Sequence, residues 1–279
     1  MPGAVAGAVL LAAVLHAAWN ALAHHIPDKL AALALMSVVY TALCLPLLVL
    51  LPAPAPAARP YLVASAALQV GYLLLLALAY RLGEFSQVYP LARGTAPLVV
   101  AVAAAVLVGE RLPPAHLAGV LVVSAGLATL VLSGGVPGRR ELPAVLAAVA
   151  TGLTIATYTV VDGVGVRRSG GVAGYAAWLF VLQGSVVAGY AAVRYGRALL
   201  PSLHGYWLRG AAGGVLALAA YGLVLWAQSR GALAAVAALR ETSVIVGAGI
   251  GAVAFRERFG PPRVAAAGLV ALGVLLINR

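Results

Sequence analysis

Two arginines lie inside stretches of the chain that are otherwise almost free of charge. Arg93 lies in "YPLARGTAP" (residues 89–97), and Arg240 lies in "ALRETS" (238–243). A guanidinium can bind a carboxylate or a phosphate-type anion through two parallel hydrogen bonds. If these stretches cross a membrane, each arginine must face a partner, water or the interior of the bundle. We expect Arg93 and Arg240 to bind an anionic substrate group; the alternative is that Arg93 only fastens helices together.

Glu241 directly follows Arg240, and on a helix its side chain projects about 100° away from that of Arg240. Three roles are open to it: pairing with Arg93 across a helix interface, binding an ammonium group, or carrying a proton and so coupling transport to protons. A buried structural ion pair is the competing interpretation. Pro97 removes the backbone hydrogen bond to the carbonyl of Arg93, so we expect a bend there.

Further polar and aromatic residues are candidates for the wall of a cavity. In "HAAWN" (16–20), His16 and Asn20 stand one turn apart on one helical face with Trp19 beside them. Taken singly, each candidate is better explained by packing or by anchoring at the membrane interface. Asp162, by contrast, is expected at the end of a span as a solvated or lipid-surface charge rather than as a carboxylate that couples transport to protons. The remaining candidate substrate-binding residues are Gln69, Tyr72, Tyr89, Tyr158, Tyr221 and Trp226.

The composition indicates that these residues lie in segments that span a membrane. The chain has 279 residues, of which 63% are hydrophobic and 9% charged, and its mean hydropathy is +1.04. Soluble globular domains do not reach such values. Because about 20 apolar residues cross the hydrocarbon core, the runs predict an all-α membrane protein with ten spans. These are 3–22, 30–51, 61–80, 86–108, 113–132, 143–161, 172–193, 208–228, 232–254 and 261–278.

The net charge of +11 does not indicate a nucleic acid partner. Nearly all basic residues fall in turns between the spans, where they meet anionic lipid headgroups, and no basic cluster is interleaved with aromatics. The expected partners are therefore membrane lipids and a small-molecule substrate. No metal-ligand set, nucleophile motif or phosphate loop is present, so we expect no cofactor and no enzymatic activity.

The chain repeats itself. A shift of 147 residues aligns the segment from residue 89 with that from residue 236 and pairs Arg93 with Arg240, Thr95 with Thr242 and Glu110 with Glu257. The sequence therefore predicts two five-helix halves, residues 1–135 and 143–279. Because five is an odd number, the second half enters the membrane from the opposite side. Inverted repeats of this kind are typical of secondary transporters, whose substrate sites lie where the halves meet.

These features resemble the drug/metabolite transporter superfamily, EamA type. The resemblance rests on the five-plus-five plan, on "HAAWN", on "YPLARGTAPLVVAVAAAVLVGERLP" from residue 89 and on "RFGPPRVAAAGLVALGVLL" from residue 258. It implies a multi-pass carrier of the bacterial inner membrane that works by alternating access and usually exports amino acids, other metabolites or toxic compounds. "HAAWN" with "YPLARGT" also resembles a branch associated with phosphonate utilisation.

Together, the residues and the resemblance predict a secondary transporter, expected to be an exporter, for a small metabolite that bears an anionic group. The substrate would be amino acid-like, an organic acid or a phosphonate. One alternative is the export of drugs or hydrophobic cations, with structural arginines and an aromatic site. Another is an intramembrane lipid-modifying enzyme with His16 or Asp162 as the base.

Overall fold

The structure is a computed structural model that describes residues 1–24, 26–83, 85–132, 138–198, 201, 204–247 and 260–278. Within these ranges the regular elements are helical. Seven helices of the described part are long and apolar enough to cross a membrane, and shorter apolar helices cover Pro114–Thr129 and Val264–Ile277. The chain is therefore a multi-pass membrane protein.

The helices follow the predicted spans closely, because the runs of apolar residues end at the charges, prolines and glycines of the turns. A short helix, α3 (Leu47–Leu50), follows α2, and a π-helix over Ala104–Val108 continues α5. The main elements are α1 (Gly3–His24), α2 (Lys29–Cys44), α4 (Arg59–Leu82), α5 (Phe85–Ala103), α6 (Pro114–Leu132), α7 (Leu142–Arg168), α8 (Val172–Tyr195), α10 (Trp207–Gln228), α11 (Leu233–Arg240) and α13 (Pro261–Ile277).

Three expected spans differ from what is observed. The span expected over 143–161 is α7, which continues to Arg168, so Asp162 lies inside the helix and not at its end. The span expected over 30–51 is interrupted between α2 and α3, because Pro46 has no N–H for the helical ladder. The span expected over 232–254 begins as α11, is broken at Glu241 and is helical again over 242–247, while residues 248–259 lie outside the described part.

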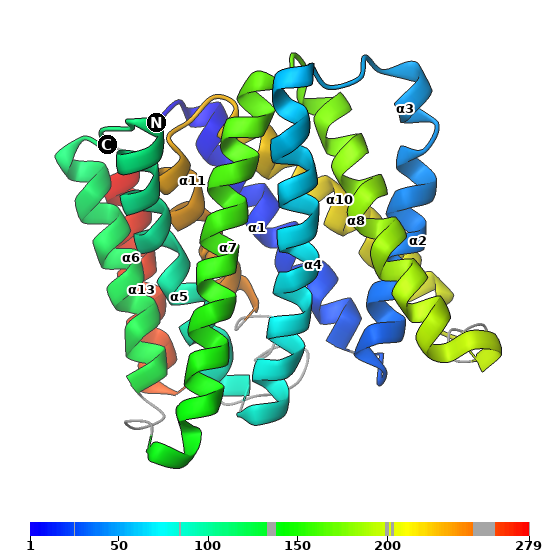
Figure 1. The fold of residues 1–279 in the computed structure, drawn as a ribbon. Helices are drawn as coiled ribbons and strands as arrows, with labels where there is room; N and C mark the ends of the chain where they lie inside the picture. The colour runs from blue at the N-terminus through cyan, green and yellow to red at the C-terminus, as the bar shows by residue number, and fades with distance from the viewer. Residues whose placement is uncertain are drawn as a thin grey trace.

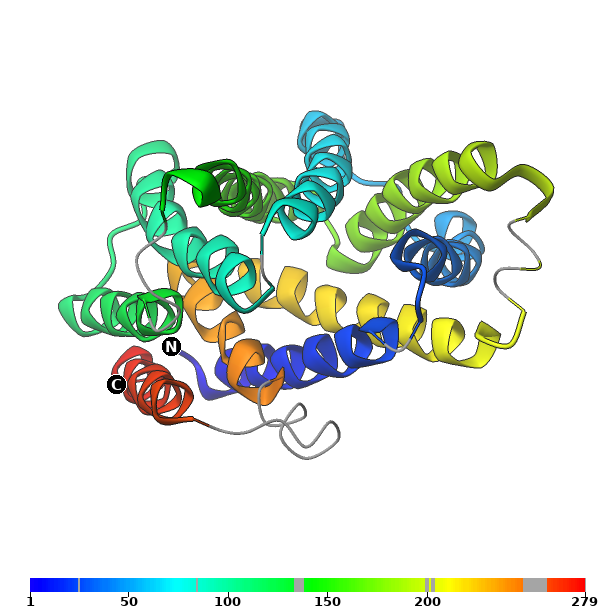
Figure 2. The same ribbon diagram turned by 90° about the horizontal axis from the view of Figure 1, so that it is seen from below.

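Figure 1 shows an upright bundle in which both ends of the chain lie on the same side. Seen from below, α6 and α13 stand at one end and α2 and α8 at the other (Figure 2). Between these ends, α4 packs against α7 and α1 packs against α10. The middle of the bundle therefore lies between the α4/α7 pair and the α1/α10 pair.

Helix α11 forms the core between these layers. All of its residues, from Leu233 to Arg240, are buried. A helix that is apolar all round requires burial on every side, and α11 has it through contacts with α1, α5, α6, α7, α10 and α13. Its last residue, Arg240, is thereby held at the centre of the molecule.

Helices α6 and α13 approach so closely that only glycine fits at their crossing. A Cβ at Gly119 would lie 2.7 Å from the carbonyl oxygen of Gly273, and one at Gly273 would lie 2.7 Å from that of Gly119. A Cβ at Gly126 would lie 3.1 Å from the carbonyl oxygen of Ala266. The two helices therefore run antiparallel. Small residues at such crossings allow the backbone packing that drives helix association in membranes.

We predict that Gly273→Ala destabilises the protein by about 1–3 kcal/mol, because the added methyl group has no space and the helices must move apart. Gly268→Ala is the matched control, since it lies on the same helix and a Cβ there would meet no described atom within 4 Å. Thermal unfolding in detergent measures both. Equal unfolding temperatures for the two variants would contradict the crossing described here.

Candidate functional site

A cavity of about 120 Å³ lies in the middle of the bundle. Residues from both halves of the chain line it, so it lies where the two halves face each other. Its wall combines two guanidinium groups, several side-chain amides and hydroxyls, and aromatic rings. The lining residues with polar or aromatic side chains are His16, Trp19, Ser37, Tyr40, Gln69, Tyr72, Arg93, Tyr158, Phe180, Gln183, Tyr221 and Arg240.

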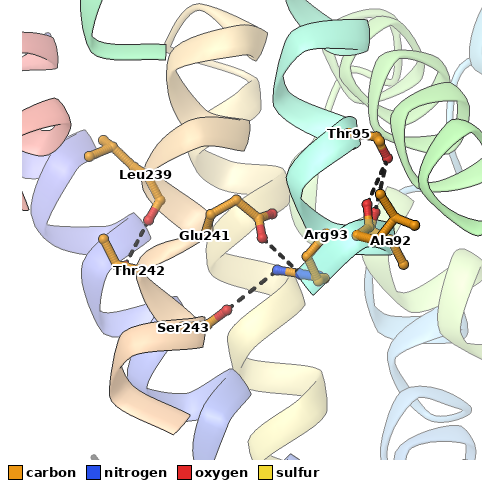
Figure 3. A network of polar contacts seen from close by, with 8 residues as sticks. Ala92, Arg93, Thr95, Leu239, Glu241, Thr242 and Ser243 are labelled. Atoms are coloured by element: carbon orange, nitrogen blue, oxygen red, sulfur yellow. Dashed lines mark hydrogen bonds and ion pairs between the residues drawn. The ribbon is translucent and has the colours of Figure 1, made fainter. Parts of the chain in front are cut away.

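Arg93 is held by a carboxylate from the opposite half of the chain. Its Nε donates a hydrogen bond of 2.8 Å to Oε2 of Glu241, and Nη2 lies 3.4 Å from Oγ of Ser243. Figure 3 shows this contact running from α5 to the segment that follows α11. Both members of the pair are buried. Of the roles open to Glu241 from the sequence, pairing with Arg93 is the one that the geometry displays.

Arg240 differs from Arg93 in its surroundings. Its side chain is only 4% exposed, and its Nε is buried without a hydrogen bond. Among the described residues, no carboxylate lies within ion-pair distance of it, although its charge acts on His16, Asp162, Tyr221 and Glu241. Burying a guanidinium without an ion-pair partner is costly, so a negatively charged group in the cavity would stabilise Arg240.

A break in the helical backbone separates the two charged neighbours. The N–H of Glu241 bonds the carbonyl of Ala238, and the N–H of Val244 bonds the carbonyl of Glu241, both three residues apart. The hydroxyl of Thr242 bonds the carbonyl of Leu239. The break turns Glu241 towards α5 and leaves Arg240 at the cavity. We expected a bend at Pro97, four residues after Arg93, but Pro97 lies within the continuous helix α5. The helical backbone is instead interrupted after Arg240.

Aromatic rings form a continuous wall around the cavity. Tyr72, Tyr158 and Tyr221 meet edge to face at centroid distances of 5.9 and 6.4 Å. The chain of rings continues through Phe180, 6.2 Å from Tyr221, to Tyr40, 4.9 Å from Phe180. A ring whose face is turned to the cavity would attract a cation such as an ammonium group.

Asp162 is fully buried, and the expectation of a solvated or lipid-surface charge was wrong. Because α7 continues past it, the carboxylate points into the bundle. Its Oδ1 accepts a hydrogen bond of 2.9 Å from Tyr175, and its Oδ2 accepts hydrogen bonds from Tyr221 and, at 3.3 Å, from Gln69. Tyr221 and Gln69 also line the cavity. The carboxylate thus lies directly behind the cavity wall.

The structure gathers most, but not all, of the predicted site residues. Glu241 lies behind Arg93, Asn20 turns its amide to the carbonyl of His16, and Trp226 stacks on Arg230 at 4.5 Å. The side chain of Tyr89 lies outside the described part. Sequence reasoning missed Ser37, Tyr40, Phe180 and Gln183, because single hydroxyls, amides and rings in apolar spans carry no repeat or charge signal. No group of three His, Cys, Asp or Glu in the described ranges is placed to hold a metal ion.

A second ionic cluster joins the segment after α5, the end of α7 and the α10–α11 turn at the side of the chain termini. Gly109 adopts a left-handed conformation (φ 74°) that ends the π-helix after α5, and glycine adopts such a turn without strain. The turn places Oε1 of Glu110 2.8 Å from Arg167, while Oε2 accepts the N–H of Leu233 at 2.8 Å. Arg167 also donates to the carbonyls of Gln228 and Gly231. We call these residues the Glu110 latch.

The latch predicts how the α10–α11 turn responds to mutation. In Glu110→Ala, backbone amides over 231–236 are expected to exchange hydrogen about tenfold faster or more, since a charge-assisted hydrogen bond contributes roughly 1.5–3 kcal/mol. Hydrogen–deuterium exchange with mass spectrometry measures this. Glu141→Ala is the control, because the described contact of that carboxylate is within its own turn, to the N–H of Gly138. Unchanged exchange in Glu110→Ala would contradict a latch.

The buried pair predicts a coupled stability effect. Arg93→Gln and Glu241→Gln are each expected to destabilise the protein by about 3–5 kcal/mol, because each leaves an uncompensated buried charge. The double variant is expected to recover most of this loss. Thermal unfolding of the four proteins gives the coupling. Losses that simply add in the double variant would show that the two side chains act independently.

Comparison with known proteins agrees with this architecture. None of the curated protein sequences matches the chain. The alignment with a solved crystal structure covers 98% of this chain and 94% of the chain in that structure, with a TM-score of 0.75. At 20% sequence identity, this similarity establishes the fold alone. Residues 142–279 match the profile of the EamA-like transporter family. The second half of the chain is thus an EamA-like transporter domain, the domain of the drug/metabolite transporter superfamily.

Proposed function

We propose that this protein is a secondary carrier of the bacterial inner membrane that moves a small metabolite bearing an anionic group. The family supports transport of a small molecule. The observation that carries the anionic group is Arg240, a buried guanidinium on the cavity wall that no carboxylate of the described residues pairs. A carboxylate or phosphonate bound there would satisfy its hydrogen-bond donors and its charge.

The rest of the cavity narrows the substrate class. Its volume of about 120 Å³ is small beside the roughly 300–1,000 Å³ of pockets that hold drug-sized ligands. The aromatic wall could hold an ammonium group while Gln69, Gln183 and Ser37 offer hydrogen bonds. An amino acid-like compound, an organic acid or a phosphonate therefore suits the site.

The packing supports an inverted repeat of five plus five helices. The predicted repeat makes α4 equivalent to α10, and α7 equivalent to α1. The helix contacts follow this equivalence, because α4 packs against α7 and the equivalent pair, α10 and α1, packs together as well. The shift of 147 residues makes Gly126 equivalent to Gly273 and Gly119 equivalent to Ala266. Gly119 packs against Gly273, and the equivalent pair, Ala266 and Gly126, packs together as well. This reciprocity is what a two-fold axis in the membrane plane produces.

The arrangement also supports alternating access. The Glu110 latch closes the bundle on the side of the termini. The cavity lining instead includes Trp19, near the end of α1, and Leu33, near the start of α2, both towards the other side. In this proposal, the described conformation closes the cavity on the side of the chain termini. The cavity opens to that side when the contacts of the Glu110 latch break.

A second candidate function is the export of hydrophobic cations, and the aromatic wall favours it. In that case the rings bind the substrate and the arginines serve only the structure. The two candidates differ in the sign of the charge that Arg240 encounters, so ligand binding separates them.

The test is the thermal stability of the purified protein against amino acids, organic acids, phosphonates and hydrophobic cations. A ligand at 100 times its Kd stabilises the folded state by about 2.7 kcal/mol. We expect an anionic compound to stabilise the wild type and to lose about 10- to 100-fold in affinity in Arg240→Gln, since charged hydrogen bonds contribute roughly 1.5–3 kcal/mol.

Arg230→Gln is the matched control, because Arg230 is exposed and stacks on Trp226 away from the cavity. Its affinity for the anion is expected to equal that of the wild type. Stabilisation by cations alone, unchanged in Arg240→Gln, would overturn the proposal in favour of cation export.

A further inference from the structure

The bundle contains two buried carboxylates whose partners differ in chemistry. Glu241 is bound by Arg93, which can only donate hydrogen bonds and carries a permanent charge. That partner holds Glu241 in its ionised form. Asp162 is bound by the hydroxyls of Tyr175 and Tyr221 and by the amide of Gln69.

The partners of Asp162 can serve both of its protonation states. A tyrosine hydroxyl donates to a carboxylate, but it can turn and accept from a carboxylic acid. A glutamine amide offers a donor on one side and an acceptor on the other. No hydrogen bond around Asp162 therefore needs to be lost when the carboxylate takes up a proton.

The charges around the cavity balance only while it is empty. In the described part of the chain, the buried charged side chains are Arg93, Arg240, Asp162 and Glu241, two of each sign. A net anion bound at Arg240 would add one negative charge in a medium where unbalanced charge is costly. Since Glu241 is fixed by Arg93, Asp162 is the buried carboxylate that can restore neutrality by taking up a proton.

We propose that Asp162 is the proton-binding group of this carrier and takes up one proton for each monoanion bound at Arg240. This inference rests on the proposed function. The proton comes from bulk solvent, forms an O–H bond on the carboxylate oxygen next to Tyr221 and neutralises Asp162, so that anion and proton together add no charge. Each ligand favours the other by the same factor, because coupling between sites is reciprocal.

Every element around Asp162 is consistent with this role. The described titratable, charged or hydrogen-bonding groups that act on it are Ser65 and Gln69 of α4, Tyr175 of α8, Tyr221 of α10 and Arg240 of α11. The only full charge among them is that of Arg240, the residue that the anion would neutralise. Helix α5 also packs on α7, but its Arg93 is engaged by Glu241.

Coupling of this kind sets the direction of transport. A carrier that binds an anion and a proton together is a symporter, and an inward proton gradient drives uptake. This differs from the export that the sequence resemblance implies. A zwitterion such as alanine adds no net charge and would bind without the proton.

Infrared titration of the purified protein tests the proton site without any ligand. We expect a carboxylic acid C=O band that disappears as the pH rises, is absent in Asp162→Asn and persists in Glu241→Gln. Tyr221→Phe, which keeps the carboxylate but removes one reversible partner, is expected to shift the midpoint of the band. A band that is unchanged in both the Asp162 and the Tyr221 variants, or is lost in Glu241→Gln, overturns the assignment.

The coupling is tested by adding methylphosphonate, lactate or alanine to the same titration. The two net anions are expected to move the midpoint to higher pH in the wild type but not in Arg240→Gln, and alanine is expected to leave it unmoved. A band that depends on Asp162 but is moved by neither anion overturns the coupling. Failure of anion binding in the stability screen overturns the proposed function instead, so the two failures are distinguishable.

Discussion

The high cost of unbalanced charge inside a bilayer governs this structure. Four charged side chains are buried in the described part of the chain, and they sum to zero. The apolar spans supply the packing, but they tolerate these charges only if each faces a partner or a cavity. This constraint accounts for three features of the structure: the broken helix after Arg240, the hydrogen-bonded burial of Asp162 and the contact between the halves at Arg93.

A duplicated helix repeat, as we propose it, would explain why only one of the two arginines is paired with a carboxylate. The shift of 147 residues that pairs Arg93 with Arg240 pairs Glu241 with Gly94. The arginine is therefore present in both halves, whereas the carboxylate is present in one. A single Glu241 can engage a single arginine, and it engages Arg93. In the proposed carrier, this asymmetry between the two halves leaves Arg240 to bind the anion.

The sequence was sufficient for much of this architecture because hydrophobic runs of membrane length and a spaced repeat are strong signals. Tertiary partners are not encoded locally, and here the predictions were weaker. Asp162 was placed at a span end because a carboxylate there resembles a boundary, but hydroxyls from two other helices, α8 and α10, satisfy it inside the bundle. Similarly, Arg93 and Arg240 look equivalent in sequence, and only the fold shows which of them Glu241 reaches.

In the proposed carrier, Arg240 receives the anion, whereas the Arg93–Glu241 pair positions helices. Isothermal titration of the stabilising anion into the double variant Arg93→Gln/Glu241→Gln tests it most directly, because this variant removes both charges of the pair and leaves the net charge unchanged. We expect the double variant to bind the anion as the wild type does, and Arg240→Gln not to bind it. Loss of binding in the double variant together with retained binding in Arg240→Gln would contradict it and would make Arg93 the substrate ligand.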